Sequence, residues 1–102
     1  MNTLAIEIDK QQIAEFCRRH HIEWLSLFGS VLRSDFGPES DVDVLVEFDP
    51  DHTPGWDFFG MQDELSGIIG RKVDLNTPGF LSRYFRDEVM AGALPIYESK
   101  RD

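Results

Sequence analysis

Hydrophobic residues recur along this chain with two periods, one typical of helices and the other typical of strands. Spacings of three and four residues predict helices over about 9–20 and 56–69, and a last one over about 81–89. The first helix begins with Asp9 and Gln12, which have the spacing of a capping box. We therefore expect each of these three segments to form a helix with one apolar side.

Strands are predicted where short runs of β-favouring residues end at glycine, proline or polar residues, namely over 22–28, 41–48, 72–77 and 94–97. Two of these runs, 41–48 and 72–77, have one apolar and one polar face, and the alternation in 72–77 is strict. In 41–48, one face carries Val42, Val44, Val46 and Phe48, and the other carries Asp41, Asp43, Leu45 and Glu47. Because each strand has a polar face, helices are expected to cover only one side of the sheet. The pattern predicts an α+β domain with an open, polar sheet face.

A turn follows the first strand at Gly29-Ser30, and we predict a short helix from Ser30 to about Phe36. The free backbone N–H groups and the dipole at a helix start favour an anion such as phosphate. The same residues also fit a plain strand-to-helix turn with Ser30 as the N-cap, and a capped turn can hold phosphate as well. Arg33 lies one turn further on, where it either contacts a phosphate or pairs with Asp35.

Three carboxylates are candidates for one site on the polar sheet face. Asp41 and Asp43 are one residue apart, so a strand projects both from the same face, and Asp74 joins them if the strands pair in register. Such a group repels itself strongly without a cation, which favours a divalent metal site. The alternative is that Asp41 caps a turn while Asp43 and Asp74 are merely exposed. Asp49 and Asp51 have the same spacing, but they lie in a Pro/Gly loop and are interpreted as solvated.

Composition narrows the class of protein. The chain has 102 residues, of which 41% are hydrophobic, so we expect one globular domain spanning 1–102. The net charge of −9 argues against direct nucleic-acid binding. Neither a membrane-spanning run nor an export signal is evident, and Cys17 is the only cysteine, so a cytoplasmic location is expected.

These residues resemble a known family. Gly29-Ser30, ten intervening residues and Asp41-Val42-Asp43 match the GS-x10-DxD motif of the minimal nucleotidyltransferases (MNT proteins), within the DNA polymerase β-like nucleotidyltransferase superfamily. The similarity extends to Arg33, to Ser40 and to the sequence KVDL at 72–75, which looks like the third-carboxylate strand of the family.

The resemblance covers most of the chain, from the first predicted helix to Tyr97. Its one departure is Val31-Leu32, where many relatives carry smaller residues; this bears on helix packing and not on the chemistry. The family's fold implies a mixed β-sheet with helices packed on one face and an open polar active-site face.

Family members of this size are typically antitoxins paired with a HEPN ribonuclease toxin. The resemblance implies that this chain is a protein adenylyltransferase, which transfers AMP from ATP to a tyrosine of the toxin and so neutralises it. It implies Asp41, Asp43 and Asp74 as catalytic residues and ligands of two Mg2+ ions, with Gly29, Ser30 and Arg33 binding the nucleotide. Asp74 acts as a metal ligand, as the general base, or as both.

Two other functions are compatible with the sequence. The chain could inhibit a HEPN toxin by binding alone, with a vestigial nucleotide site. It could instead transfer a nucleotide to a small molecule or a nucleic-acid end, although such enzymes usually need an added acceptor domain. Trp56 and Phe59 are expected in the core, with a partner interface as the alternative.

Overall fold

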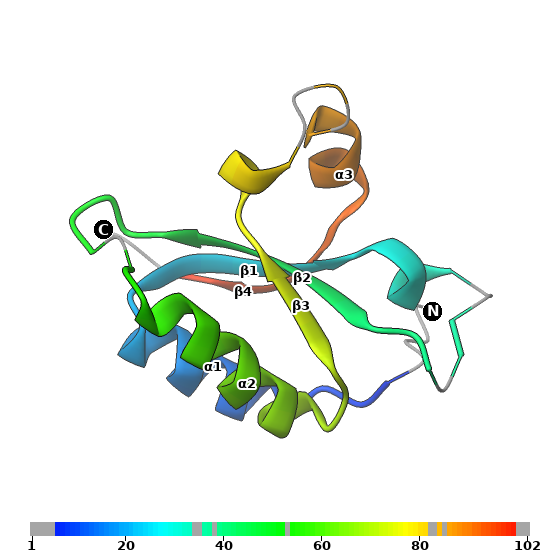
Figure 1. Ribbon diagram of the computed structural model, residues 1–102, viewed down its shortest axis with the longest axis horizontal. Coiled ribbons are helices and arrows are strands. Elements are labelled where there is room, and N and C mark those ends of the chain that lie inside the picture. The colour runs from blue at the N-terminus through cyan, green and yellow to red at the C-terminus, as the bar shows by residue number, and fades with distance from the viewer. Residues whose placement is uncertain are drawn as a thin grey trace.

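The computed structural model describes residues 6–33, 36–37, 39–52, 54–81, 84 and 86–99. Its elements follow in the order α1 (Lys10–Arg19), β1 (Ile22–Phe28), η1 (Gly29–Leu32), β2 (Val42–Phe48), α2 (Asp57–Ile69), β3 (Val73–Asn76), η2 (Pro78–Phe80), α3 (Arg86–Gly92) and β4 (Leu94–Glu98), where η marks a 3-10 helix. Figure 1 shows the sheet crossing the middle of the molecule. The predicted α+β class is confirmed.

The four strands form one mixed sheet in the order β3-β2-β1-β4. β1 pairs antiparallel with both β2 and β4, whereas β2 and β3 run parallel. A parallel pair needs a crossover connection, and α2 supplies it. This arrangement brings the starts of β2 and β3 together at one end of the sheet.

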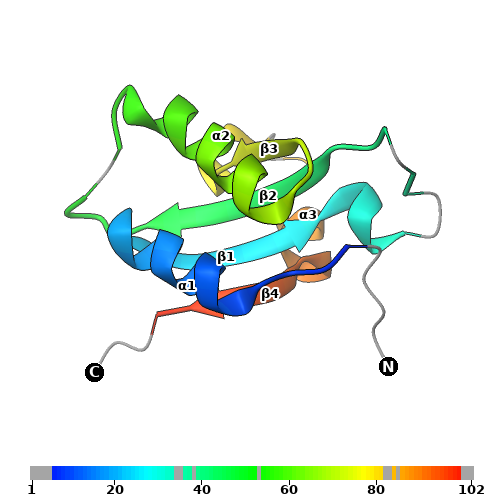
Figure 2. The same ribbon diagram turned by 90° about the horizontal axis from the view of Figure 1, so that it is seen from below.

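The two long helices, α1 and α2, lie side by side over one face of the sheet (Figure 2). The core is formed between them and the sheet, and it includes Phe16, Leu65, Val42, Val44 and Val46, all fully buried. The Asp9 carboxylate caps α1 by accepting hydrogen bonds from the backbone N–H groups of Gln11 and Gln12. The predicted apolar face of β2 is therefore the face that packs against these helices.

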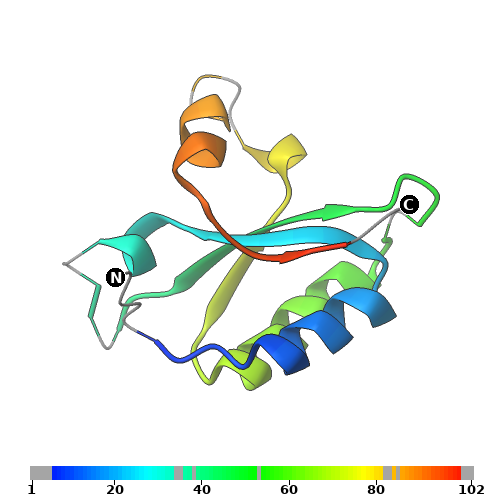
Figure 3. The same cartoon turned by 180° about the vertical axis from the view of Figure 1, so that it is seen from behind.

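The third helix, α3, lies on the opposite face of the sheet together with η2, as seen from behind in Figure 3. Leu45 belongs to the polar face of β2 yet is fully buried, and it lines a small pocket with Trp24 and Met90. Leu45 is the one apolar residue that the alternation places on that face, and burying it favours the packing of α3 against that face. The polar face is thus partly covered at Leu45.

Two predicted helices are shorter in the structure. The helix predicted over 30–36 is a single 3-10 turn that ends at Leu32, after which Arg33 is extended; residues 34 and 35 lie outside the described residues. Val31 is buried and Leu32 exposed, so this segment has no apolar stripe that would stabilise a longer helix. The helix predicted over 81–89 is replaced by η2 and α3, and residues 82, 83 and 85 are not among those described.

No helix in the described ranges is both long and apolar enough to cross a membrane.

Candidate active site

The end of β1 and the start of β2 approach each other closely at Gly29 and Asp43. Gly29 has a φ of +75°, and a Cβ there would overlap the Asp43 carboxylate, with the Asp43 Cγ only 3.1 Å away. Phe28, the residue before Gly29, is the register partner of Asp43. Gly29 is therefore required both by its backbone conformation and by the space that the carboxylate occupies.

Asp43 lies beside the carboxylate of β3. Asp43 and Asp74 are direct register partners of the parallel β2–β3 pair, so both side chains project from the same face. Asp41 is two residues before Asp43 and is partly buried, whereas Asp74 is exposed. The predicted register is thus found for Asp43 and Asp74, whereas Asp41 lies just before the first residue of β2.

The environment of Asp43 disfavours its ionised form. Burial raises the pKa of Asp43, and the negative charges of Asp74 and Asp41 raise it further. A hydrogen bond from the backbone N–H of Ser30 and the positive charge of Arg33 oppose this rise in the pKa. Four other predicted site residues, Asp41, Asp74, Ser30 and Arg33, therefore influence the pKa of Asp43, and the fifth, Gly29, leaves space for its carboxylate.

The prediction for Ser30 needs a correction in its physical basis. Because η1 is one four-residue 3-10 turn, it lacks the aligned peptide dipoles of a helix that would favour phosphate at its start. The Ser30 N–H instead donates to the Asp43 carboxylate. For Arg33, the structure shows an exposed side chain whose charge acts on Asp43, and its alternative partner Asp35 lies outside the described residues.

Among the described residues, no three His, Cys, Asp or Glu side chains already converge closely enough to hold a metal ion. The donor set of Asp41, Asp43 and Asp74 nevertheless suits a hard divalent cation, which prefers carboxylate oxygens. A cation would also offset the repulsion that raises the pKa of Asp43.

The second Asp-x-Asp pair differs from the first, as predicted. Asp51 is exposed, and its backbone N–H donates to the Asp49 carboxylate at 2.9 Å, which is the hydrogen bond of an Asx turn. The pair closes a loop, away from the register partners of β2 and β3.

Sequence reasoning missed Arg71, which binds the loop before Asp41. Its guanidinium donates hydrogen bonds to the carbonyl oxygens of Gly37 at 2.7 Å and Ser40 at 3.0 Å. It also lies over the Phe36 ring, 4.6 Å from the centroid. The sequence shows only an arginine directly before the predicted strand that carries Asp74. An arginine at such a position is too common to predict a contact with a particular loop.

Carboxylates on neighbouring strands beside a glycine turn are compatible with metal-assisted transfer of phosphate-containing groups. The model of the nucleotidyltransferase domain family matches residues 10–94 of the chain. The chain belongs to this nucleotidyltransferase domain family.

Known proteins support the same family. A Methanocaldococcus jannaschii protein, provisionally named a protein adenylyltransferase, is 35% identical over 75 residues, which span 65% of this chain and 75% of that protein. A solved structure, provisionally described as a minimal nucleotidyltransferase, is 30% identical with a TM-score of 0.70 and covers 84% of this chain and 87% of its own.

A third comparison concerns a complex. A chain in the structure of the tri-AMPylated Shewanella oneidensis HEPN toxin with an MNT antitoxin has a TM-score of 0.62 and 18% identity, covering 88% of this chain and 70% of its own. At this identity the likeness shows a shared fold.

Proposed function

We propose that this chain is an antitoxin that transfers AMP from ATP to a tyrosine hydroxyl of a partner HEPN ribonuclease toxin. The observation that carries the proposal is the placement of Asp43, which is the register partner of Asp74, feels the charge of Asp41 and lies beside a glycine that leaves room for its carboxylate. The M. jannaschii relative named a protein adenylyltransferase and the fold shared with an MNT–HEPN complex support this choice of reaction and partner.

In the proposed reaction, the tyrosine oxygen attacks the α-phosphorus of ATP. The bond from that phosphorus to the bridging oxygen breaks, pyrophosphate leaves, and the hydroxyl proton passes to a carboxylate. Asp74 is the exposed member of the three and is therefore the one proposed to face the incoming hydroxyl.

Asp41, Asp43 and Asp74 would hold Mg2+, and two ions per site fit three carboxylates that share phosphate oxygens as ligands. When bound, Mg2+ neutralises charge on the triphosphate and lowers the pKa of the attacking hydroxyl. The backbone N–H groups of Gly29 and Ser30 would bind phosphate, and Arg33 would supply positive charge nearby. The use of ATP sets the proposed reaction in the cytoplasm.

The decisive experiment incubates the chain with ATP, Mg2+ and the protein encoded beside it, followed by intact mass measurement. We expect one or more AMP units on the partner, and none with Asp43→Asn. Asp51→Asn is the matched control, because Asp51 belongs to the exposed loop pair with the same spacing. Full toxin neutralisation by Asp41→Asn/Asp43→Asn without a mass change would refute AMP transfer as the cause of neutralisation and favour inhibition by binding alone.

A further inference from the structure

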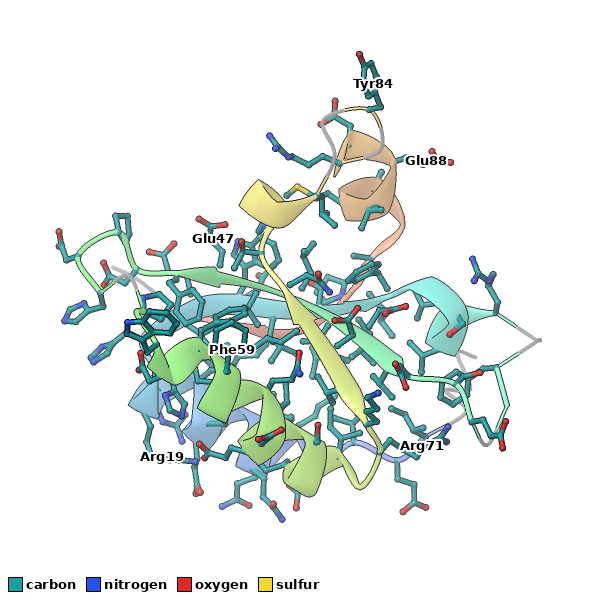
Figure 4. All side chains as sticks on the ribbon, in the orientation of Figure 1. Arg19, Glu47, Phe59, Arg71, Tyr84 and Glu88 are labelled. Atoms are coloured by element: carbon teal, nitrogen blue, oxygen red, sulfur yellow. The ribbon has the colours of Figure 1, made fainter. Side chains whose placement is uncertain are left out.

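Arg71 joins the start of β3 to the loop that leads into β2. Its Nη2 donates to the carbonyl oxygens of both Gly37 and Ser40, and its guanidinium stacks over Phe36. Arg71 is only partly buried, so these contacts sit at the surface end of the sheet (Figure 4).

The loop is also closed on itself. The Ser40 N–H donates to the Gly37 carbonyl at 3.1 Å, and the Ser40 hydroxyl accepts from the Gly37 N–H at 3.0 Å. The Gly37 carbonyl therefore accepts from both Ser40 and Arg71, and the side chain of Arg71 completes a turn that the loop begins.

The residues on either side of Asp41 are both held by the start of β3. Ser40 accepts from Arg71 through its carbonyl, and the Val42 N–H donates to the Lys72 carbonyl at 2.8 Å. Arg71 and Lys72 are consecutive and stand three and two residues before Asp74. The backbone of Asp41 is thus fixed relative to the strand that carries Asp74.

We propose that Arg71 is a positioning residue for the carboxylate site, which holds Asp41 in place relative to Asp43 and Asp74. The inference rests on the proposed nucleotidyl transfer for its effect on the reaction. The contacts of Arg71 are to carbonyl oxygens and a ring, so it acts on the geometry of the loop. The positive charge that lowers the pKa of Asp43 is that of Arg33.

Two variants separate the contacts of Arg71. Arg71→Met keeps an apolar stem but removes every hydrogen-bond donor. Arg71→Lys keeps a charged donor on a stem of similar reach but loses the planar group that stacks on Phe36. Arg19→Met is the matched control, because Arg19 is an exposed arginine that pairs with Glu64 on the helical face.

The first measurement is amide hydrogen exchange of the protein alone, without nucleotide or metal. Arg71→Met is expected to speed exchange about tenfold or more in peptides covering 39–43, while α1 and α2 keep their wild-type rates, because only the loop opens. Arg71→Lys is expected to fall between wild type and Arg71→Met. Unchanged exchange over 39–43, or an equal rise in α1 and α2, would overturn the proposal.

The second measurement is AMP transfer to the partner. A misplaced Asp41 is expected to lower kcat on the order of 10- to 100-fold in Arg71→Met, with KM for ATP little changed. A raised KM with an intact kcat would overturn the proposal, because it would make Arg71 a nucleotide contact. Absence of transfer by the wild-type chain would instead refute the proposed function, and the exchange measurement would still decide whether Arg71 holds the loop.

Discussion

Replacing Gly29 by alanine tests the close approach of β1 and β2 directly. A non-glycine residue at a φ of +75° costs about 1–2 kcal/mol in backbone strain. The new Cβ also overlaps the Asp43 carboxylate and must displace it, and overpacking of this kind costs about 1–3 kcal/mol more. We therefore expect Gly29→Ala to lower the free energy of unfolding by about 2–5 kcal/mol, adding the two costs.

The chain contains a matched control at Gly70, the left-handed C-cap of α2. Its φ is +78°, nearly that of Gly29, but a Cβ there meets nothing within 4 Å. Gly70→Ala should lose only the backbone contribution of about 1–2 kcal/mol. The difference between the two variants isolates the contact with Asp43.

Urea unfolding followed by circular dichroism measures both variants, with the slope m checked for constancy. A double variant tests whether the overlap with Asp43 causes the extra loss of stability. In an Asp43→Ala background the overlap is relieved, so Gly29→Ala should lower the free energy of unfolding by no more than Gly70→Ala does. The reasoning is refuted if Gly29→Ala and Gly70→Ala destabilise the wild-type chain equally, or if the excess cost persists without the Asp43 carboxylate.

Other predictions follow from the charges and the surface. The raised pKa of Asp43 means that the folded state binds more protons than the unfolded state above the ordinary pKa of 3.8. Stability is therefore lost as pH rises from that value through the raised pKa, and Asp43→Asn should be more stable than wild type at pH 7 by urea unfolding. Mg2+ should raise the Tm of wild type and not of Asp43→Asn; equal shifts would contradict metal binding at this residue. Asp74→Asn should fold without a lower Tm, because it removes a like charge beside Asp43, while AMP transfer falls by orders of magnitude; wild-type turnover would remove Asp74 from the reaction. Trp56 and Phe59 are 90% and 65% exposed, so Phe59→Ser should weaken the partner complex in calorimetric titration without lowering Tm; unchanged affinity would exclude that surface.

The surface exposure of Trp56 and Phe59 differs from the expected core role, and the reason is geometric. α2 buries Met61 and Leu65 and partly buries Phe58, and these three already fill the side that faces the sheet. Phe59 is one residue beyond Phe58 and so points away from that side (Figure 4), where it lines an apolar groove that also contains Glu47. The apolar character of Phe58 and Phe59 alone could not show which of the two faces the sheet and which faces solvent.

The strands were predictable because alternation over β2 and β3 specifies both their ends and their faces. The same period placed Asp43 and Asp74 on one face, and the parallel register then put them opposite each other. The short helix after Ser30 could not be predicted in length, because four residues carry too little periodicity to separate a 3-10 turn from a longer helix. The contacts of Arg71 depend on the path of a loop, and loop paths leave no period in a sequence.

The placement of Asp43 explains why so many separate segments meet at one residue. A carboxylate that is partly buried beside two others is unfavourable in the folded protein, and its raised pKa expresses that cost. Gly29 leaves space for the carboxylate, and the Ser30 N–H supplies a hydrogen bond to it. The register with Asp74 places a second negative charge close to Asp43. Gly29 and the Ser30 N–H reduce this cost, whereas the nearby charges of Asp74 and Asp41 increase it when no cation is bound. A site that served only folding would be more stable with an uncharged residue at position 43, so the presence of this carboxylate supports the proposed cation site.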